Sequence, residues 1–338
     1  MAKDASIDTG KSLMQGGGRW ATERFAAALK AGASIGPNLL RTADTLHPNE
    51  WKHFDSVVVR EGALRLRGIA DLINLGLTMD VPNAMGKMLV EWDKITDMDD
   101  ADVSLSGLDE TPNTGLEFER DSIPLPITHK DFNINLRTLA ASRNMGIPLD
   151  TTQAETAARK VGEKLEEMLF VGGKTFGGKT IYGYLTHPHV NDVHFHDAET
   201  WDSATKDGEE IVVDVMAGIS ALEADRFYGP YRLYIPSAYN AKMETDFKAY
   251  SSLTIRQRLK NIDRITDVVT VDKLTADKVV LAQMTRDVVC LVNGEGIQTV
   301  QWDLMGGFNS KFKVFAIQVP LIRSDVEGRC GVCIIQAA

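Results

Sequence analysis

One long amphipathic helix constrains the fold of this chain more than any other feature of its sequence. It is predicted from Asp150 to about Val171, because apolar residues recur there every three or four positions and share one helical face. The Asp150 side chain can cap the free backbone N–H of Thr152 or Gln153. The predicted buried face consists of Ala154, Ala157, Ala158, Val161, Leu165, Met168 and Leu169. A helix about 30 Å long with one apolar face requires a core along its whole length.

The rest of the chain alternates a second helix with many short strands. An amphipathic helix is predicted at Glu209–Leu222, and Gly229-Pro230 then leads into an apolar strand at Tyr231–Ile235. Asn293–Gly296 is predicted as a turn between two of the later strands. These strands are expected at Ile265–Val271, Lys278–Gln283, Val288–Val292, Ile297–Trp302, Phe312–Val319 and Gly331–Ile335. This order indicates an α+β fold, and the lack of any repeat excludes solenoids and propellers.

Residues 1–45 are predicted to form an N-terminal arm. Gly16-Gly17-Gly18 interrupts regular structure before a short helix at Arg19–Ala33, and Gly36-Pro37 ends that helix. We expect the arm to bind another molecule. From Pro48 to Leu75 the apolar spacing predicts one broken helix or two short helices.

A long β-hairpin is predicted between Asp93 and Lys130, with its turn at Pro112–Gly115. Its acidic patch consists of Asp97, Asp99, Asp100 and Asp102. Its apolar positions are Val103, Leu105, Leu116, Phe118, Ile123, Leu125 and Ile127. So few apolar residues among so many charges cannot build a separate core. We therefore expect the hairpin to project from the body and to pack on another subunit.

Composition excludes several classes of protein. The 338 residues carry 47 acidic and 37 basic side chains, a formal net charge of −10, with 43% hydrophobic residues, so the chain is globular and lacks the positive field of a nucleic-acid-binding protein. No apolar run could span a bilayer, and the opening residues lack a signal-peptide core, so we expect no membrane contact and a cytoplasmic location. Cys290, Cys330 and Cys333 are interpreted as small buried apolar residues.

The segment from Gly173 to Thr180 matches the phosphate-binding P-loop pattern, with Lys179 in the lysine position. A P-loop follows a buried strand and opens a helix, whereas this segment follows the long helix and precedes an expected strand or turn at Ile181–Leu185. Asp214 could serve as the magnesium-binding acid, but its neighbours have helical spacing. We interpret Gly173–Thr180 as a glycine-rich hairpin.

Four histidines, His187, His189, His194 and His196, lie within ten residues and could form two metal-binding pairs. Pro188 and the polar residues around it instead favour an exposed loop. The acidic run Asp97–Asp102 lacks the glycine and distal glutamate of a calcium-binding EF-hand loop, so we interpret it as a solvated charged face.

No Gly-x-Ser-x-Gly, His-Glu-x-x-His or protein-kinase motif occurs. A Ser-His-Asp triad assembles across a fold, so the sequence alone leaves that possibility open. We assign no catalytic, cofactor-binding or metal-binding residue and predict that the protein is not an enzyme.

The order of these elements resembles the Hong Kong ninety-seven type phage capsid proteins, and in particular their encapsulin-like branch. The resemblance covers about residues 46 to 336. The residues that carry it are Leu46 and Trp51, Ile123–Ile127, Phe132, Leu136, Phe170–Gly183, Asp225–Asn240 with its Gly229–Ile235 core, and Phe312–Ile317. It implies a capsid fold with an N-terminal arm, an extended hairpin loop, a peripheral domain with a long spine helix, and an axial domain.

The resemblance implies a division of the chain into six segments. They are an N-terminal arm at 1–45, an N-terminal helical segment at 46–92, the extended hairpin loop at 93–130, a peripheral domain with the spine helix at 131–202, an axial domain at 203–306, and peripheral return strands at 307–338.

For function, the resemblance implies a major capsid protein that self-assembles through pentamers and hexamers into an icosahedral shell around a phage genome. It implies a place in the virion capsid, with assembly in the host cytoplasm and only weak nonspecific contact with double-stranded DNA. Portal, scaffolding and decoration proteins are the expected partners. The scaffolding protein is expected to be separate because the chain lacks the long N-terminal scaffolding segment of some relatives.

Two alternatives remain open at the level of sequence. One is an encapsulin shell that stores an enzyme cargo, although the 45-residue arm and the longer hairpin depart from encapsulins. The other is a nucleotide- or metal-dependent enzyme, which would form a small oligomer with a bound ligand.

Overall fold

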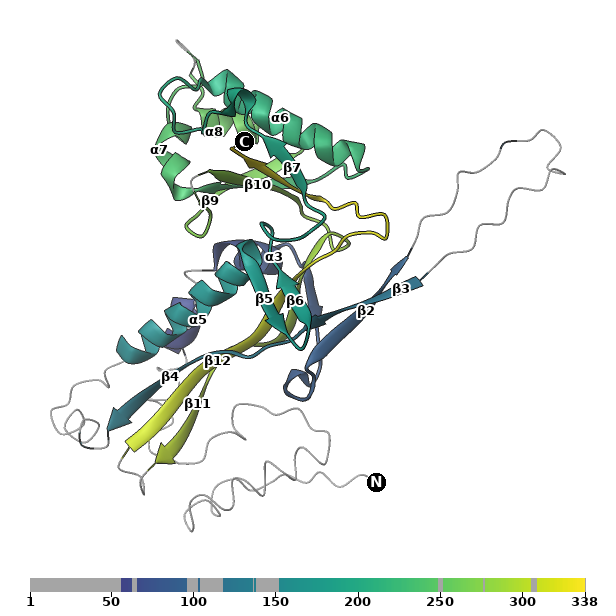
Figure 1. Cartoon of the computed structure of the whole chain (residues 1–338). Helices are drawn as coiled ribbons and strands as arrows, with labels where there is room; N and C mark the ends of the chain where they lie inside the picture. Colours follow the sequence, from purple (N-terminus) through teal and green to yellow (C-terminus); the bar gives the residue numbers. More distant parts are fainter. Residues whose placement is uncertain are drawn as a thin grey trace, which may run out of the picture.

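The computed structural model describes residues 56–62, 66–95, 103, 118–135, 137, 152–248, 252–275, 277–304 and 309–337. It arranges them as an elongated body, a second helix-covered sheet beside it, and a projecting strand pair (Figure 1). The predicted arm, the helix at 19–33 and the acidic run at 97–102 lie outside these residues.

A four-stranded sheet forms the centre of the body within the described residues. Its order is β1 (Thr78–Asp80), β11 (Val289–Leu304), β12 (Asn309–Ile322) and β4 (Thr128–Asn135). Strand β1 runs parallel to β11, and the other pairs are antiparallel.

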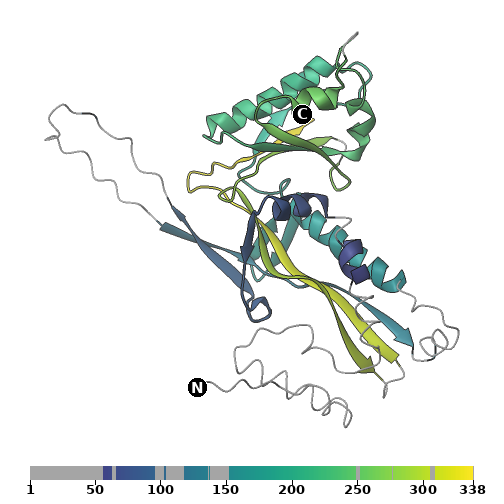
Figure 2. The same cartoon turned by 180° about the vertical axis from the view of Figure 1, so that it is seen from behind.

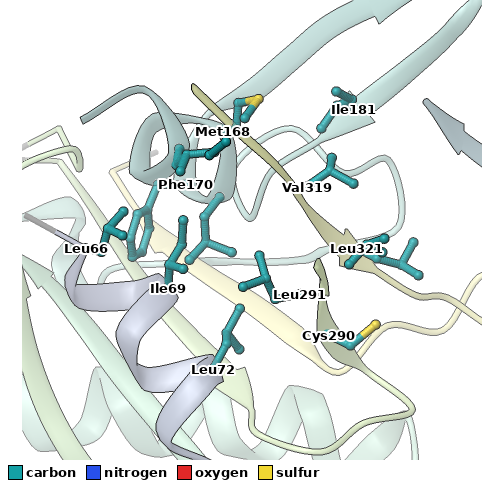
Figure 3. Close-up of a cluster of buried hydrophobic side chains, with 14 of the residues drawn as sticks. Leu66, Ile69, Leu72, Met168, Phe170, Ile181, Cys290, Leu291, Val319 and Leu321 are labelled. Carbon is teal, nitrogen blue, oxygen red and sulfur yellow. The ribbon is translucent and has the colours of Figure 1, made fainter. Parts of the chain in front are cut away.

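The long helix α5 (Thr152–Phe170) packs along β12 and β4, and this confirms the strongest sequence prediction. All seven residues of its predicted apolar face are buried. The two predicted short helices are also present, at residues 56–62 and as α3 (Arg67–Asn74). Ile69 and Leu72 of α3 meet Phe170 and Leu291 in the core, so the helices and the sheet share one apolar interior (Figure 3).

A five-stranded sheet forms the second part of the described chain. Its order is β7 (Asn191–His194), β13 (Val332–Gln336), β10 (Lys278–Gln283), β8 (Tyr231–Pro236) and β9 (Ile265–Val271). Helices α6 (Gly208–Ala224), α7 (Asn240–Met243) and α8 (Ile255–Lys260) cover one face. Short 3₁₀ turns lie at Ala84–Gly86, His196–Ala198 and Ser237–Tyr239.

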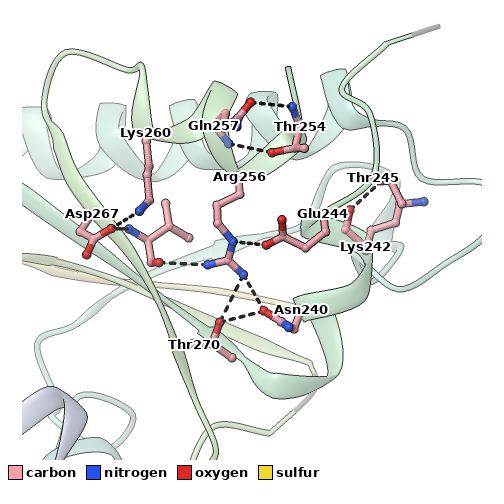
Figure 4. A network of polar contacts seen from close by, with 11 residues as sticks. Asn240, Lys242, Glu244, Thr245, Thr254, Arg256, Gln257, Lys260, Asp267 and Thr270 are labelled. Atoms are coloured by element: carbon pink, nitrogen blue, oxygen red, sulfur yellow. Dashed lines mark hydrogen bonds and ion pairs between the residues drawn. The ribbon is translucent and has the colours of Figure 1, made fainter. Parts of the chain in front are cut away.

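Arg256 of α8 fastens the small helices to this sheet. Its guanidinium donates to the Glu244 carboxylate at 2.7 Å, to the Asn240 side-chain oxygen at 2.6 Å and to the Val268 carbonyl at 3.1 Å (Figure 4). The short helices α7 and α8 therefore depend on tertiary contacts as well as on their own backbone bonds.

The opposite face of the five-stranded sheet packs on the body. The Tyr234 ring of β8 lies edge-on to Phe170 at 5.2 Å between centroids and stacks on Tyr184 at 5.9 Å. The three rings are almost fully buried, so this aromatic cluster joins the two sheets.

One predicted turn was wrong. Asn293–Gly296 does not reverse the chain but lies inside the continuous strand β11, where two register shifts against β12 form bulges. A Cβ on Gly294 would lie 2.3 Å from the Ala84 Cβ, so glycine here allows close approach of two backbones instead of a turn.

The sheets also divide the chain differently from the expected segments. Strand β11 starts within the expected axial segment 203–306 but belongs to the body sheet, whereas β7 and β13 belong to the five-stranded sheet although they lie in 131–202 and 307–338. An apolar run shows that a strand is buried, but it does not show which sheet the strand joins. None of the described helices is long and apolar enough to cross a membrane.

Candidate functional site

Two paired strands leave the body and form the part of the predicted hairpin that lies nearest to it. Strands β2 (Leu89–Ile95) and β3 (Phe118–Pro124) pair antiparallel, so the pairing begins four residues before the predicted start at Asp93. Along β3, Ile123 and Pro124 are buried, while the residues from Phe118 to Arg120 are exposed. The strands therefore project away from both sheets (Figures 1 and 2).

Ion pairs join the outer parts of these two strands. The Arg120 guanidinium lies 3.2 Å from Asp93 and 3.7 Å from Glu91 on the opposite strand. Phe118, the first residue of β3, lies beyond these ion pairs on the side away from the body and is 64% exposed. An aromatic side chain exposed on a projecting strand is available to pack against another protein chain.

The hairpin root is the region where β2 and β3 meet the glycine-rich hairpin formed by β5 (Gly172–Phe176) and β6 (Lys179–Tyr182). Asp121 lies 3.1 Å from the Lys94 ammonium and 3.7 Å from the Lys179 ammonium. Burial alone would raise the pKa of Asp121, but the Ser122 N–H and these lysines hold it below its usual value. Asp121 therefore joins both hairpins as a carboxylate.

The structure confirms that Gly173–Thr180 is a glycine-rich hairpin. Gly177 and Gly178 form its turn with φ of +56° and +80°, a conformation that glycine adopts without strain. No helix follows the turn, and the Lys179 ammonium is directed at Asp121. The segment thus lacks the helix N-terminus with which a P-loop binds phosphate.

The four histidines do not form one cluster in the described structure. The His187 and His189 rings lie 5.8 Å apart beside Tyr182 at the hairpin root. Burial lowers the pKa of His187 to about 4, with a smaller effect from His189, so its ring is neutral near pH 7. His194 ends β7, and His196 lies close to Asp197 and Glu210 on the five-stranded domain.

Buried polar groups that the sequence patterns did not indicate lie at the junction between the two sheets. Glu166 of α5 is 3% exposed and accepts hydrogen bonds from the backbone N–H groups of Gly68 at 2.8 Å and Ile69 at 3.4 Å. It thereby caps the first turn of α3. Burial raises its pKa to about 7, although those two hydrogen bonds act in the opposite direction. Its position beside the apolar face of α5 was the available signal, since charged residues are rarely buried there without partners.

Two cavities lie next to these groups. One of about 470 Å³ borders Glu166 and is lined mainly by charged side chains, among them Arg67, Arg159, Glu163 and Lys273. The other, about 260 Å³, lies at the hairpin root beside Lys94 and Asp121. Both differ from the mainly apolar pockets in which proteins bind small substrates.

The remaining chemical candidates are packing residues. All three cysteines are buried thiols whose pKa values are raised by burial, which confirms the sequence interpretation. Asp214 lies within α6 with 1% of its side chain exposed and pairs with the equally buried Lys206 at 3.1 Å. It is therefore a core residue in this structure and not an exposed metal ligand.

Comparison with known proteins relates this architecture to shell-forming proteins. The profile of a family of unknown function, DUF6260, matches residues 41–335. The type 1 encapsulin shell protein EncA of Myxococcus xanthus is 28% identical over 137 residues, which is 40% of this chain and 46% of that protein. The chain thus matches about half the length of this curated relative.

Solved structures show the same fold over much longer stretches. The virus-like particle from Pyrococcus furiosus has a TM-score of 0.61 at 17% identity, covering 86% of this chain and 99% of that chain. The capsid of Myoviridae Phage XM1 has a TM-score of 0.60 at 14% identity, covering 78% and 90%. The capsid of the empty GTA particle has a TM-score of 0.54 at 13% identity, covering 92% and 98%. The α+β prediction and the Hong Kong ninety-seven type capsid fold are confirmed.

Proposed function

Because this chain belongs to the DUF6260 family and has the Hong Kong ninety-seven type capsid fold, we propose that it is the repeating subunit of a closed icosahedral shell. More specifically, we propose a major capsid protein that encloses the genome of a tailed phage. The observation that carries this proposal is the projecting pair β2–β3 on a capsid fold, whose Phe118 is 64% exposed in the described part of the chain.

Each part of the subunit has a role in this proposal. Helix α5 is the spine of the peripheral domain, the five-stranded sheet is the core of the axial domain, and the hairpin of residues 93–130 clasps a neighbouring subunit. The segment from 1 to 45, which lies outside the described residues, serves as an arm that binds another molecule. Many such contacts, each modest, add up over pentamers and hexamers because every subunit is held at several places.

The charge of the chain suits a container for DNA. With a net charge of −10, the shell wall repels phosphate groups, so a packed genome makes only weak, nonspecific contact with it. Portal, scaffolding and decoration proteins are the partners that such a shell requires, and assembly takes place in the host cytoplasm before the protein becomes part of the virion capsid.

An encapsulin shell that stores an enzyme is the second candidate, favoured by the 28% identity to EncA over 137 residues. The two functions differ in what the particle contains. A phage capsid protects DNA from added nuclease, whereas an encapsulin holds a folded enzyme by a terminal peptide. An enzyme that acts on its own would form neither particle.

The test is to isolate native particles, treat them with nuclease, and analyse their contents by DNA extraction and mass spectrometry. Protected double-stranded DNA of genome length supports the phage capsid. A stoichiometric enzyme without DNA supports the encapsulin. A small, discrete oligomer with a bound nucleotide or metal contradicts both.

A further inference from the structure

Three potential metal ligands converge at the surface of the five-stranded domain. One ligand atom each from His196, Asp197 and Glu210 lies within 4.8 Å of the others, and these residues form the one such group among the described residues. The His196 Nδ1 and an Asp197 carboxylate oxygen are 3.0 Å apart. Two ligands at about 2.0–2.1 Å from one ion are separated by about 2.9–3.4 Å, so this pair already has the required spacing.

The backbone of His196 is fixed by a buried ion pair. Its N–H donates to the Asp214 carboxylate at 2.6 Å, and its carbonyl accepts from the Lys206 ammonium at 2.6 Å. Lys206 and Asp214 pair with each other at 3.1 Å, and Trp201 donates to the same carboxylate at 2.8 Å. The backbone at His196 is therefore anchored to groups of the domain core, while the imidazole itself is half exposed.

The turn after His196 and the start of α6 position the backbone of the two acidic members. Asp197 adopts a left-handed conformation with φ of 59°, which directs the chain through the tight turn after His196. One carboxylate oxygen of Glu210 accepts from the Asp207 N–H at 3.0 Å at the start of α6, which leaves its second oxygen available. Rotation of these exposed or half-exposed side chains would bring the three ligand atoms from within 4.8 Å of one another to the spacing that one ion requires.

Helix capping accounts for only part of this arrangement. Acidic side chains near the start of a helix interact favourably with its dipole, so Glu209 and Glu210 alone would not indicate a metal site. The His196 imidazole lies close to both Asp197 and Glu210, and it adds a nitrogen ligand that helix capping does not require. The nearby Lys206 ammonium is paired with Asp214, which reduces its repulsion of a bound cation.

We propose that His196, Asp197 and Glu210 bind one divalent transition-metal ion per subunit, of the Zn²⁺ class, with the open positions filled by water. One imidazole and two carboxylates suit a borderline divalent ion better than Ca²⁺ or Mg²⁺, which prefer oxygen ligands alone. The site lies apart from the hairpin and adds a ligand-binding property to the proposed shell subunit.

The test is calorimetric titration of the untagged, full-length protein with ZnCl₂, followed by Co²⁺ absorption spectroscopy at the same site. We expect one ion per subunit, with loss of binding in His196→Ala. Asp197→Asn keeps a residue that tolerates the left-handed turn, and Glu210→Gln keeps an oxygen for the Asp207 N–H. Each should weaken binding by roughly tenfold or more, because each removes one charged ligand.

The matched control is His194→Ala, which removes an exposed histidine outside the cluster and should bind Zn²⁺ like the unmodified protein. Thermal unfolding of each variant in the absence of metal shows whether the fold is retained. If the unmodified protein binds no Zn²⁺ at millimolar concentration, the proposal is wrong. Binding that is unchanged in both Asp197→Asn and Glu210→Gln would also overturn it, since the ion would then occupy other ligands.

Discussion

The Asp71 carboxylate lies 2.8 Å from the Arg232 guanidinium, and this ion pair joins α3 of the body to β8 of the five-stranded sheet. The side chains are 17% and 14% exposed. The Tyr234 hydroxyl also donates to Asp71 at 3.3 Å, and Asp267 lies 3.9 Å from Arg232 on its other side. The relative position of the two sheets is thus fixed by charge as well as by the aromatic cluster.

Asp71→Ala should destabilise the subunit by about 3 kcal/mol, because among the described residues it leaves the mostly buried Arg232 guanidinium with the longer ion pair to Asp267 alone. Chemical denaturation of the purified subunit measures this loss. Glu91→Ala is the matched control, since it removes one exposed carboxylate from the hairpin and should change the unfolding free energy by less than about 0.5 kcal/mol. Equal losses in the two variants would show that the junction does not depend on the ion pair.

Glu166 should make the subunit less stable as the pH rises. Its pKa is raised from 4.5 to about 7 by burial, so the folded state holds a proton that the unfolded state has released. Its favourable contribution is complete below pH 4.5 and is lost as the pH rises to about 7, by an amount on the order of 3 kcal/mol. Denaturation at a series of pH values measures the slope.

Glu166→Gln should remove this contribution, because glutamine keeps an acceptor for the Gly68 N–H and does not titrate. It is measured as the difference between the variant and the unmodified protein at each pH, since His187, whose pKa burial lowers to about 4, contributes a slope of the opposite sign in the same range. Glu163→Gln is the matched control on the same helix. The pKa of Glu163 is lowered, mainly by a hydrogen bond from Lys160, so this variant should leave the slope between pH 5 and 7 in place. An unchanged slope in Glu166→Gln would refute the assignment.

Phe118→Ser should leave the subunit folded and weaken its assembly, because Phe118 is 64% exposed and contributes to neither buried core of the described residues. Thermal unfolding and light scattering measure the two effects separately. Phe118→Leu keeps an apolar side chain and should assemble much better than the serine variant. If both variants assemble like the unmodified protein, the hairpin surface is not an interface.

The local structure of this chain could be predicted from its sequence much better than its tertiary pairing. Strands β9 and β10 have the bounds that their β-branched runs indicate, and α5 differs from its prediction by two residues at the start and one at the end. Asn293–Gly296 was mistaken for a turn because glycine also occurs where two backbones approach closely.

The junction could not be predicted in the same way. Asp71 and Arg232 are far apart in the sequence, and no local pattern links one acid to one distant base. The long-range polar contacts at Glu166 and Asp121 are likewise set by the packing of whole elements. The glycine-rich hairpin was predicted correctly because the evidence against a P-loop is local. The long helix precedes this segment and a strand, not a helix, follows its turn.

Lys179→Ala should not change nucleotide binding, because the Lys179 ammonium faces Asp121 and no phosphate-binding helix follows the turn. Calorimetry with ATP and Mg²⁺ should show no binding to either protein. ATP binding that is present in the unmodified protein and lost in Lys179→Ala would overturn this assignment.

Electron microscopy of the purified full-length protein, together with light scattering, tests the central claim most directly. A shell subunit should form closed, hollow particles of uniform size that contain many copies of the 37.2 kDa chain. A monomer or dimer that stays stable over a range of concentrations, while circular dichroism shows an intact fold, would contradict the account.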